Sequence, residues 1–358
     1  MTAVLEAALS LNSPFPSHEL VQIVRGRRSG LPITVAVHST ALGPAAGGCR
    51  IAHYPGPAAA VADALRLAAA MTAKNALADL EHGGGKTVVA LPTAARPDGA
   101  ERTALLHDIG DVIESLGGRY LTGPDVGSGP ADMSVIGERT TRVCCRPVED
   151  GGSGDSSLHT ARGTLAALGA VAEEVFGSPD LAGRTVAVIG LGAVGAHVAR
   201  LLHRAGARLV VTDIDPAARA LAGELGAAWA DPDDALATEA DILVPAALGG
   251  VLTTRTVPLL RCAAVAGPAN NQLDEPATAA LLAARGILWA PDVVVSAGGV
   301  IHATGVELRR ETEERLTGRL QGIGTTLREV FRAARTQRCT PADAAAELAA
   351  RRVRGRHG

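Results

Sequence analysis

Residues 184–213, RTVAVIGLGAVGAHVARLLHRAGARLVVTD, contain an apolar run, a glycine-rich turn, a helical pattern and a second apolar run. Gly190, Gly192 and Gly195 fit the pattern GxGxxG, which is weak evidence when it occurs alone. Here the glycines follow one predicted strand and open a predicted helix, and Asp213 ends the next predicted strand, 18 residues after Gly195. In that context the segment predicts the βαβ unit of a dinucleotide-binding Rossmann domain.

This predicted turn suggests which dinucleotide binds. Backbone N–H groups at a helix N-terminus attract a pyrophosphate, and we expect Ala193 and Val194 to take part. An acidic residue at the position of Asp213 accepts a hydrogen bond from the ribose 2′-OH and repels a 2′-phosphate, which predicts NAD rather than NADP. We expect Asp215 to cap the helix that starts at Pro216.

The rest of the chain indicates a second α/β domain. The runs DILVPAA (241–247), CAAVAG (262–267) and ILWAPDVVV (287–295) have the spacing of further strands in a parallel sheet. The N-terminal half has strand-like runs of its own, interleaved with a helical pattern over residues 57–77. Between the halves, RPVEDGGSGDSSLHT (146–160) has the composition of a linker.

Composition limits the class of protein. A chain of 358 residues can form two domains, and a net charge of -3 does not favour nucleic acid or an anionic membrane as partner. No apolar run reaches the roughly 18 residues of a membrane span, and the N-terminal segment lacks the basic region of a secretory signal. Five cysteines without CxxC spacing favour reduced thiols over a disulfide framework or zinc site. We predict a cytoplasmic protein without a metal.

Lysine usage points to chemistry. Lys74 and Lys86 are the only lysines among 34 basic side chains, although a bias toward Ala, Gly and Arg explains why lysine is scarce. A lysine can lose its proton near neutral pH when it is buried, whereas an arginine cannot. Lys86 follows three glycines that would let a substrate approach, and we expect it at the start of the strand TVVAL, facing a cleft. Lys74 lies on the predicted helix, where the plain alternative is a solvent-facing side chain.

Several further motifs occur in the order found in one known family. They are HSTALGPAAGG (38–48), MTAKNALADLEHGGGK (71–86), PDVGSGPADM (124–133), GPANNQL (267–273) and APDVVVSAGGVI (290–301). Together with GLGAVG they resemble the Glu/Leu/Phe/Val dehydrogenase family over nearly the whole chain, and its valine and leucine dehydrogenases most closely.

The resemblance implies an architecture and a reaction. The architecture is two α/β domains around a cleft: a substrate-binding and oligomerisation domain over residues 1–145, and a Rossmann NAD-binding domain over 146–331. A C-terminal helical segment over 332–358 packs back on the first domain, and the chain forms a homo-oligomer. The reaction is reversible oxidative deamination, in which a branched-chain, bulkier or aromatic L-amino acid, NAD and water give the 2-oxo acid, NADH and ammonia.

The resemblance also assigns roles. Lys74 would bind the substrate carboxylate, Lys86 would polarise the carbonyl and activate water, and Asp125 would exchange a proton with the amino group. Asn270 would help to hold the substrate, and Thr160 would contact the nicotinamide carboxamide. The other implied substrate contacts are Ala46, Gly47, Gly48, Met71, Gly123 and Val300, and the other cofactor contacts are Ala247, Asn270 and Ser296. This chemistry needs an anchor that orients Cα and a base of lowered pKa.

Some positions depart from the usual leucine or valine enzyme. Ala46 stands for a leucine, Ala73 for an aromatic residue and Gly123 for a slightly larger residue, while Ser296 replaces an asparagine near the nicotinamide. One hypothesis is a pocket enlarged toward a bulkier or aromatic amino acid. The alternative is that small residues reflect the Ala and Gly bias and that neighbours close the gap.

The motifs also bear on other possible functions. HExxH, GxSxG and a P-loop are missing from the sequence, so metal-dependent and serine-hydrolase readings lack support. A non-catalytic NAD-binding relative stays open, although the joint presence of Lys74, Lys86 and Asp125 counts against it. An NAD-dependent imine reductase or cyclising deaminase also stays open, and a requirement for free ammonia would separate it from an amino acid dehydrogenase.

Overall fold

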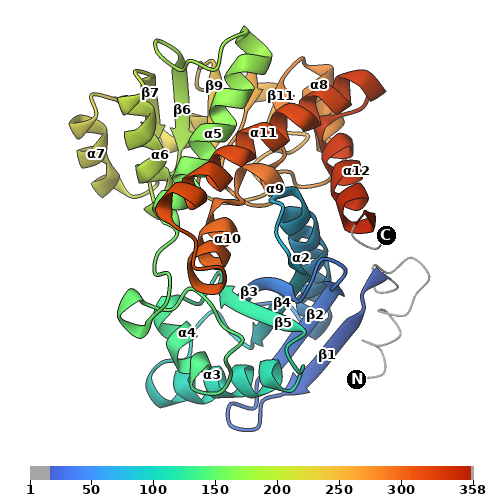
Figure 1. Cartoon of the computed structure of the whole chain (residues 1–358). Coiled ribbons are helices and arrows are strands. Elements are labelled where there is room, and N and C mark those ends of the chain that lie inside the picture. Colours follow the sequence, from blue (N-terminus) through green and yellow to red (C-terminus); the bar gives the residue numbers. More distant parts are fainter. Residues whose placement is uncertain (1–16, 356–358) are drawn as a thin grey trace. The chain divides into compact units, whose positions relative to one another are not determined.

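A computed structural model describes residues 17–355 and divides the chain into two compact units (Figure 1). Unit 1 comprises Met1–Asp155, Val306–Arg310 and Ala349–Gly358, and unit 2 comprises Ser156–Gly305 and Glu311–Leu348. Most of the N-terminal segment compared above with a secretory signal lies outside the described residues.

Unit 1 is built on a mixed five-stranded sheet of order β1-β2-β4-β3-β5. Strand β2 pairs antiparallel with β1 and β4, whereas β3 pairs parallel with β4 and β5. The strands are β1 (Leu20–Arg25), β2 (Pro32–Ser39), β3 (Ala45–His53), β4 (Gly83–Leu91) and β5 (Tyr120–Pro124). The helices are α2 (Pro57–Leu77), α3 (Gly99–Glu114), α4 (Pro130–Gly137) and the short η2 (Val148–Asp150).

Helices cover both faces of this sheet (Figure 1). Alternate residues of a strand face opposite sides, so Val35 joins the core under α3 and α4 while Ala36 packs with α2. Helix α2 begins at Pro57, the favoured first position for proline, and its alanine-rich face lets it lie close to the strands. The predicted helix over residues 57–77 is confirmed, and it places Lys74 in its last turn.

Unit 2 is built on a six-stranded sheet of order β11-β10-β9-β6-β7-β8, in which every pairing is parallel. This is the doubly wound Rossmann order, with its switch point between β6 and β9, and it confirms the predicted fold class. The strands are β6 (Thr185–Ile189), β7 (Arg208–Thr212), β8 (Ala228–Trp229), β9 (Ile242–Pro245), β10 (Ala264–Val265) and β11 (Leu288–Trp289).

In unit 2, one helix precedes the first strand, helical segments join successive strands, and further helices follow the last strand. The helical elements are α5 (Ser157–Phe176), α6 (Ala193–Arg204), η3 (Pro216–Ala218), α7 (Arg219–Glu224), η4 (Pro232–Ala237), η5 (Val257–Leu259), α8 (Thr278–Ala284), α9 (Asp292–Val295), α10 (Gly298–Ala303) and α11 (Glu313–Gln337). The π-helix η6 (Thr304–Leu308) and α12 (Pro341–Arg354) each contain residues of both units. One expectation was wrong: in the run over 287–295, only Leu288–Trp289 is a strand, and Asp292–Val295 is helical. A short apolar run does not by itself distinguish a buried strand from a buried helix.

The domain limits at residues 145 and 331 stay a prediction, and the compact units differ from them in detail. Unit 1 extends to Asp155, within the linker-like segment, and takes only the last residues of the C-terminal segment, from Ala349. Within unit 1, Arg352 donates to the backbone oxygens of Ala76 and Leu77 at the end of α2.

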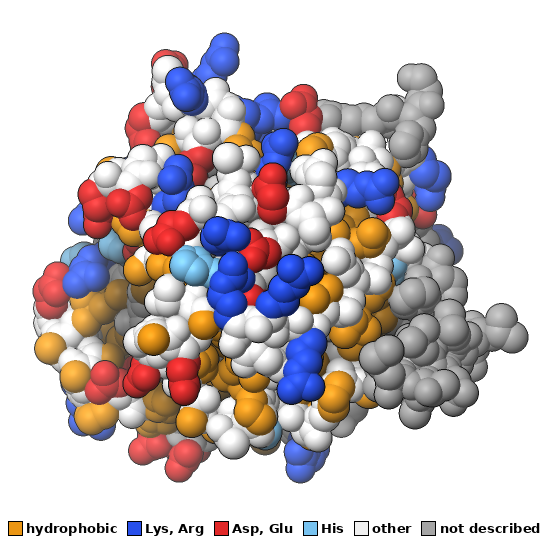
Figure 2. All heavy atoms as spheres, turned by 90° about the horizontal axis from the view of Figure 1, so that it is seen from below, with side chains coloured by type: hydrophobic (Ala, Val, Ile, Leu, Met, Phe, Trp, Pro, Cys, Tyr) orange, Lys and Arg blue, Asp and Glu red, His pale blue; other side chains and the backbone are white. Residues whose placement is uncertain are grey.

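Two surface features bear on partners. Acidic and basic side chains are interspersed on the face shown in Figure 2, so no patch of one sign stands out among its described residues. Between residues 17 and 355, none of the helices has the length and apolar character of a membrane span.

Candidate active site

The glycine triplet that precedes Lys86 forms the first three residues of strand β4. Strand β4 starts at Gly83, so Lys86 is an interior residue of the strand, and the expectation that it begins the strand was wrong. A side-chain carbon on Gly84 would lie 2.1 Å from the backbone nitrogen of Thr72 on α2. The glycine therefore lets the strand run against the helix backbone, which a larger residue would prevent.

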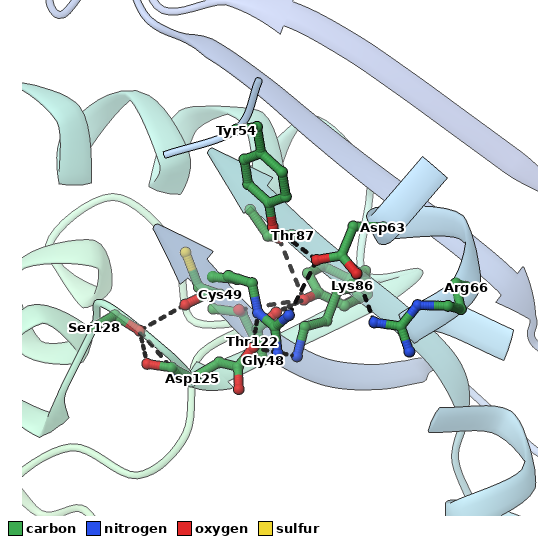
Figure 3. Close-up of polar contacts among 12 residues, drawn as sticks. Gly48, Cys49, Tyr54, Asp63, Arg66, Lys86, Thr87, Thr122, Asp125 and Ser128 are labelled. Atoms are coloured by element: carbon green, nitrogen blue, oxygen red, sulfur yellow. Dashed lines mark hydrogen bonds and ion pairs between the residues drawn. The ribbon is translucent and has the colours of Figure 1, made fainter. Parts of the chain in front are cut away.

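Lys86 forms a close ion pair with Asp125 (Figure 3). Nζ of Lys86 lies 2.6 Å from Oδ2 of Asp125, and the two side chains are 6% and 21% exposed. Asp125 directly follows β5, and its backbone N–H donates to Oγ of Ser128, which in turn donates to the Cys49 carbonyl on β3. The carboxylate is thus fixed to the neighbouring strand at the edge of the sheet.

Gly48 lies beneath this ion pair on β3. A side-chain carbon at this position would lie 2.8 Å from Cβ of Asp125 and 3.2 Å from Nζ of Lys86. Any larger residue would push the carboxylate or the amine away. The predicted residues Gly48, Lys86 and Asp125 therefore meet at one point of unit 1.

Burial and charge set the protonation of the pair. Burial lowers the pKa of Lys86, and the Asp125 charge restores it only in part. Burial raises the pKa of Asp125, but the positive charges of Lys86 and Arg50 outweigh this effect and hold the pKa at about 2. At neutral pH Asp125 is therefore a carboxylate, beside an amine that releases its proton more readily than an exposed lysine.

Arg50, on β3, is a second cation on the same carboxylate. Its Nε donates to Oδ2 of Asp125 at 3.0 Å, and its Nη1 donates to Oδ2 of Asp63 at 3.0 Å. Asp63, on α2, also accepts from the hydroxyl of Tyr54 at 2.7 Å and from Arg66 at 2.7 Å (Figure 3). The result is a continuous chain of charged side chains that leads from Lys86 to the surface of α2.

Sequence reasoning missed Arg50, Asp63, Tyr54 and Ser128. One signal was available: Gly48 and Arg50 are two residues apart on a strand and so face the same side. Since Gly48 was a predicted substrate residue, this spacing predicts that Arg50 lies on the same side of the strand as the site. The partners of Arg50 could not have been found this way, because α2 and β3 meet only in the folded chain.

The other predicted substrate residues of unit 1 surround the same sheet edge. A side-chain carbon on Gly47 would lie 3.4 Å from Cγ of Met71, and Lys74 follows Met71 on the same face of α2. Ala46 is 3% exposed, and Asn75 donates to its carbonyl as well as to that of the first glycine of β4. Asn75 thereby ties the end of α2 to both strands.

Gly123 has a neighbour that occupies part of the missing volume. It pairs with Gly48 across β3 and β5, and a side-chain carbon on it would lie 3.2 Å from Sγ of Cys144. Cys144 is a buried free thiol. At this position the structure therefore favours compensation by a neighbour over an enlarged pocket.

In unit 2 the glycine-rich turn follows β6, as predicted. Gly190 has φ +99°, and a side-chain carbon on it would lie 2.6 Å from Cβ of Ala247, while one on Gly195 would lie 2.0 Å from the Gly190 oxygen. By contrast, no described atom lies within 4 Å of the corresponding position on Gly192. The first and third glycines permit the tight turn and close packing, and the second leaves an open approach to the backbone.

The start of α6 fits an anionic ligand. Gly192 caps the helix without a side-chain hydrogen bond, so the N–H groups from Ala193 and Val194 onward are not satisfied by a cap. Asp213 follows β7 and accepts from the backbone N–H of Leu191 at 2.6 Å, which attaches it to the turn. These residues would hold the pyrophosphate and the adenine ribose of NAD. Asp215 accepts from the Ala217 N–H, which confirms its predicted capping role.

The remaining predicted residues form a second group in unit 2. Oγ of Ser296 donates to Oδ1 of Asn270 at 3.2 Å. A side-chain carbon on Gly299 would lie 3.2 Å from Oγ1 of Thr160, so the starts of α5 and α10 are in contact, and Val300 is the next residue of α10. Among residues 17–355, no three His, Cys, Asp or Glu side chains cluster as metal ligands would.

Comparison with known proteins identifies the family. Residues 21–142 match the model for Glu/Leu/Phe/Val dehydrogenase, dimerisation domain, and residues 219–357 match that for Glutamate/Leucine/Phenylalanine/Valine dehydrogenase. Residues 157–258 match the NAD binding domain of D-isomer specific 2-hydroxyacid dehydrogenases, which covers the Rossmann turn.

Individual relatives agree with the family models. The chain is 41% identical to a leucine dehydrogenase of Geobacillus stearothermophilus, over 94% of this chain and 90% of that protein. It is 43% identical to a valine dehydrogenase of Streptomyces albus, over 94% of this chain and 92% of that protein. The structure of L-tryptophan dehydrogenase from Nostoc punctiforme is similar, with a TM-score of 0.82 and 34% identity over 99% of each chain. The chain therefore belongs to the Glu/Leu/Phe/Val dehydrogenase family and is an NAD-dependent amino acid dehydrogenase.

Proposed function

We propose that this enzyme catalyses the reversible oxidative deamination of a nonpolar L-amino acid, branched-chain or bulkier, to its 2-oxo acid and ammonia. The observation that carries the proposal is the ion pair of buried Lys86 with half-buried Asp125 above Gly48. A lysine of lowered pKa and a carboxylate that is ionised before the substrate binds are the base and the proton carrier that this reaction needs.

Asp125 and Lys86 divide the proton transfers between them. Asp125 would take a proton from the substrate ammonium, and bound NAD would supply the acceptor for the hydride of Cα. Neutral Lys86 takes a proton from the water that adds to the resulting iminium carbon. Asp125 returns its proton to nitrogen, and ammonia leaves as the carbonyl forms, with the hydroxyl proton passing by way of Asp125 to the departing ammonia. Lys86 finally releases its proton to solvent, so ammonium and one further proton are produced.

Other residues would bind and orient the substrate. Lys74 would hold the carboxylate, because it shares the face of α2 that carries Met71, beside Gly47. Asn270 and Val300 would also contact the substrate, and Thr160 and Ser296 would contact the nicotinamide. A charged anchor fixes Cα when the substrate binds. The loss of translational and rotational entropy then occurs on binding and no longer adds to the barrier of hydride transfer.

The residues proposed to contact the substrate side chain favour a nonpolar substrate. Ala46, Met71 and Val300 are apolar, and Gly123 is backed by the Cys144 thiol. Because Gly123 is compensated in this way, the enlarged-pocket hypothesis rests on Ala46 and Ala73. Turnover of valine, leucine, phenylalanine and tryptophan measures the pocket directly, and a clear preference for valine would contradict the enlarged pocket.

The cellular setting is also proposed. We expect a cytoplasmic homo-oligomer that uses unit 1 for assembly, with small molecules and neither nucleic acid nor membrane as its partners. Support comes from the match of residues 21–142 to a dimerisation domain and from the mixed charges on the face in Figure 2. Light scattering of the purified enzyme would test assembly, and a monomeric mass would contradict it.

The experiment for the reaction itself is NAD reduction with L-amino acids, with the D-enantiomers as controls. We expect turnover of at least one nonpolar L-amino acid and release of one ammonia for each NADH formed. NADH formation without ammonia would point instead to the imine reductase or cyclising deaminase alternative.

A further inference from the structure

Arg50 occupies a position that the proposed reaction does not yet explain. Its guanidinium lies between two carboxylates, with Nε on Oδ2 of Asp125 and Nη1 on Oδ2 of Asp63, each at 3.0 Å. The side chain is 19% exposed, so this is a largely desolvated contact. Such charge-assisted hydrogen bonds are shorter and stronger than neutral ones, and the planar fork fixes their directions.

Tyr54 and Arg66 fix Asp63, the second carboxylate that Arg50 contacts. Asp63 accepts from Tyr54 Oη on the same oxygen that Arg50 uses, and from Arg66 on its other oxygen. Burial raises the pKa of Asp63, but the hydrogen bonds from Tyr54 and Arg66 and the charge of Arg50 lower it below its usual value. Asp63 is therefore a fixed anion that orients Arg50.

The two cations on Asp125 use the same atom. Lys86 at 2.6 Å and Arg50 at 3.0 Å both contact Oδ2. Among the described residues, the hydrogen bond from Arg50 and the shortest contact of Lys86 both go to Oδ2 of Asp125, and no side chain donates a hydrogen bond to Oδ1. One oxygen is thus held by cations, and the other is left for the substrate nitrogen.

The proposed reaction makes this sharing necessary. Lys86 has to lose its proton to act as a base, and Asp125 would then lose one of its two cations. A buried carboxylate without a cation has a raised pKa and would tend to stay protonated. Arg50 cannot lose its proton at any working pH, so its charge still lowers the pKa of Asp125 when Lys86 is neutral.

We propose that Arg50 is a positioning residue of the reaction, which holds Oδ2 of Asp125 with a permanent charge while Lys86 exchanges its proton, so that Oδ1 meets the substrate nitrogen. Asp63 and Tyr54 keep Arg50 in this orientation. The inference rests on the proposed function, and it assigns opposite requirements to two neighbouring cations: Lys86 must titrate and Arg50 must not.

The test compares Arg50→Gln and Arg50→Lys with the wild type in NAD reduction by the best L-amino acid, over a range of pH. For Arg50→Gln we expect kcat to fall by about tenfold to a hundredfold, the scale of one lost charge-assisted hydrogen bond, with an unchanged Kd for NADH. We expect kcat to rise with pH as Lys86 loses its proton. In Arg50→Gln this rise should move to higher pH, because the charge of Arg50 lowers the pKa of Lys86.

The other titratable or charged groups near Lys86 are the same residues in these variants. They are Asp125 directly after β5, Cys49 on β3, Asp63 and Arg66 on α2, and Tyr54 before α2. Arg50→Lys keeps the charge but lacks the fork that reaches both carboxylates. We expect its pH profile to stay near that of the wild type, while its kcat remains reduced.

Two further variants keep the test decisive. Asp63→Asn leaves Arg50 in place without its counter-charge, so the alkaline rise should move to lower pH, and this result would support the proposal even if Arg50→Gln does not fold. Arg28→Gln is a matched control, because Nη1 of Arg28 also joins two aspartates of unit 1, Asp108 and Asp111. We expect wild-type kcat and pH profile for it.

The outcomes separate this proposal from the proposed function. A wild type without amino acid turnover would overturn both. An active wild type, with a folded Arg50→Gln enzyme that binds NADH and has an unchanged pH profile, would overturn the positioning role alone. A fall in stability without any shift of the profile would likewise mean that Arg50 is only structural.

Discussion

Nζ of Lys86 lies 2.6 Å from Oδ2 of Asp125, and both groups lie over Gly48, where a side-chain carbon would approach Nζ to 3.2 Å. This relationship combines three motifs that are far apart in the sequence. It places the amine in a buried environment that lowers its pKa, and it keeps the carboxylate ionised. The proposed chemistry depends on both effects, because the amine has to release a proton and the carboxylate has to accept one.

The two lysines should respond differently to arginine. Lys86→Arg keeps the positive charge but removes the proton that can be released, so we expect kcat to fall by about 10²- to 10⁴-fold, as with Lys86→Met. Lys74→Arg keeps a cation that can hold a carboxylate, and its main effect should be a higher KM. Steady-state kinetics of the three variants measure this, and a Lys86→Arg enzyme with near wild-type kcat would rule out the base role.

Lys86 should lower the stability of the enzyme at neutral pH. Its pKa in the folded chain is below the value of about 10.4 expected in the unfolded chain, so the unfolded chain binds more protons between these two values. Stability from this residue therefore rises with pH through that window. Lys86→Met should match or exceed the wild-type Tm at neutral pH, and its advantage should shrink toward about pH 10. A Tm several degrees lower at neutral pH would show that the ion pair stabilises the fold.

Ala46 should set the size of the accepted side chain. Ala46→Leu adds volume at a buried strand position, so we expect kcat/KM for phenylalanine or tryptophan to fall relative to valine by about tenfold or more. Gly123→Ala is the comparison, because its new carbon would lie 3.2 Å from Sγ of Cys144, a contact that requires only a small shift. Equal loss for all substrates in Ala46→Leu would mean that the residue does not line the pocket.

Asp213 should set the cofactor preference. In Asp213→Ser the carboxylate that would repel a 2′-phosphate is gone, so the ratio of kcat/KM for NADP to that for NAD should rise. Activity with NAD should also fall, because Asp213 accepts the N–H of Leu191 in the glycine-rich turn. Asp231→Ser removes a comparable cap, on Asp233, away from this turn and is the control. An unchanged ratio would contradict the assignment of Asp213 to the ribose.

The Rossmann half was predictable because its signals are local. The strand, the three glycines, the helix and Asp213 are consecutive, and each has a physical reason for its position. Predictions failed where tertiary contacts decide the local structure. Lys86 was expected to begin its strand, yet the three glycines before it belong to the same strand, and α2 packs against Gly84. The segment Asp292–Val295 suggested a strand because an apolar run of this length is too short to show a helical period.

In the site, too, residues with a local sequence signal were predictable, and residues defined by tertiary contacts were not. Scarcity of lysine singled out Lys74 and Lys86, since their chemistry differs from that of arginine. Arg50 gave no such signal in a chain where nearly every basic residue is arginine. Its importance comes from lying between Asp125 and Asp63, and only the folded chain brings these two carboxylates together.

The most direct test is NADH oxidation with a panel of nonpolar 2-oxo acids, with and without ammonium, for the wild type and for Lys86→Ala. Activity of the wild type that requires ammonium, and that falls by at least about 10²-fold in Lys86→Ala, is the predicted result. Turnover that does not need ammonium, or that survives loss of Lys86, would contradict it.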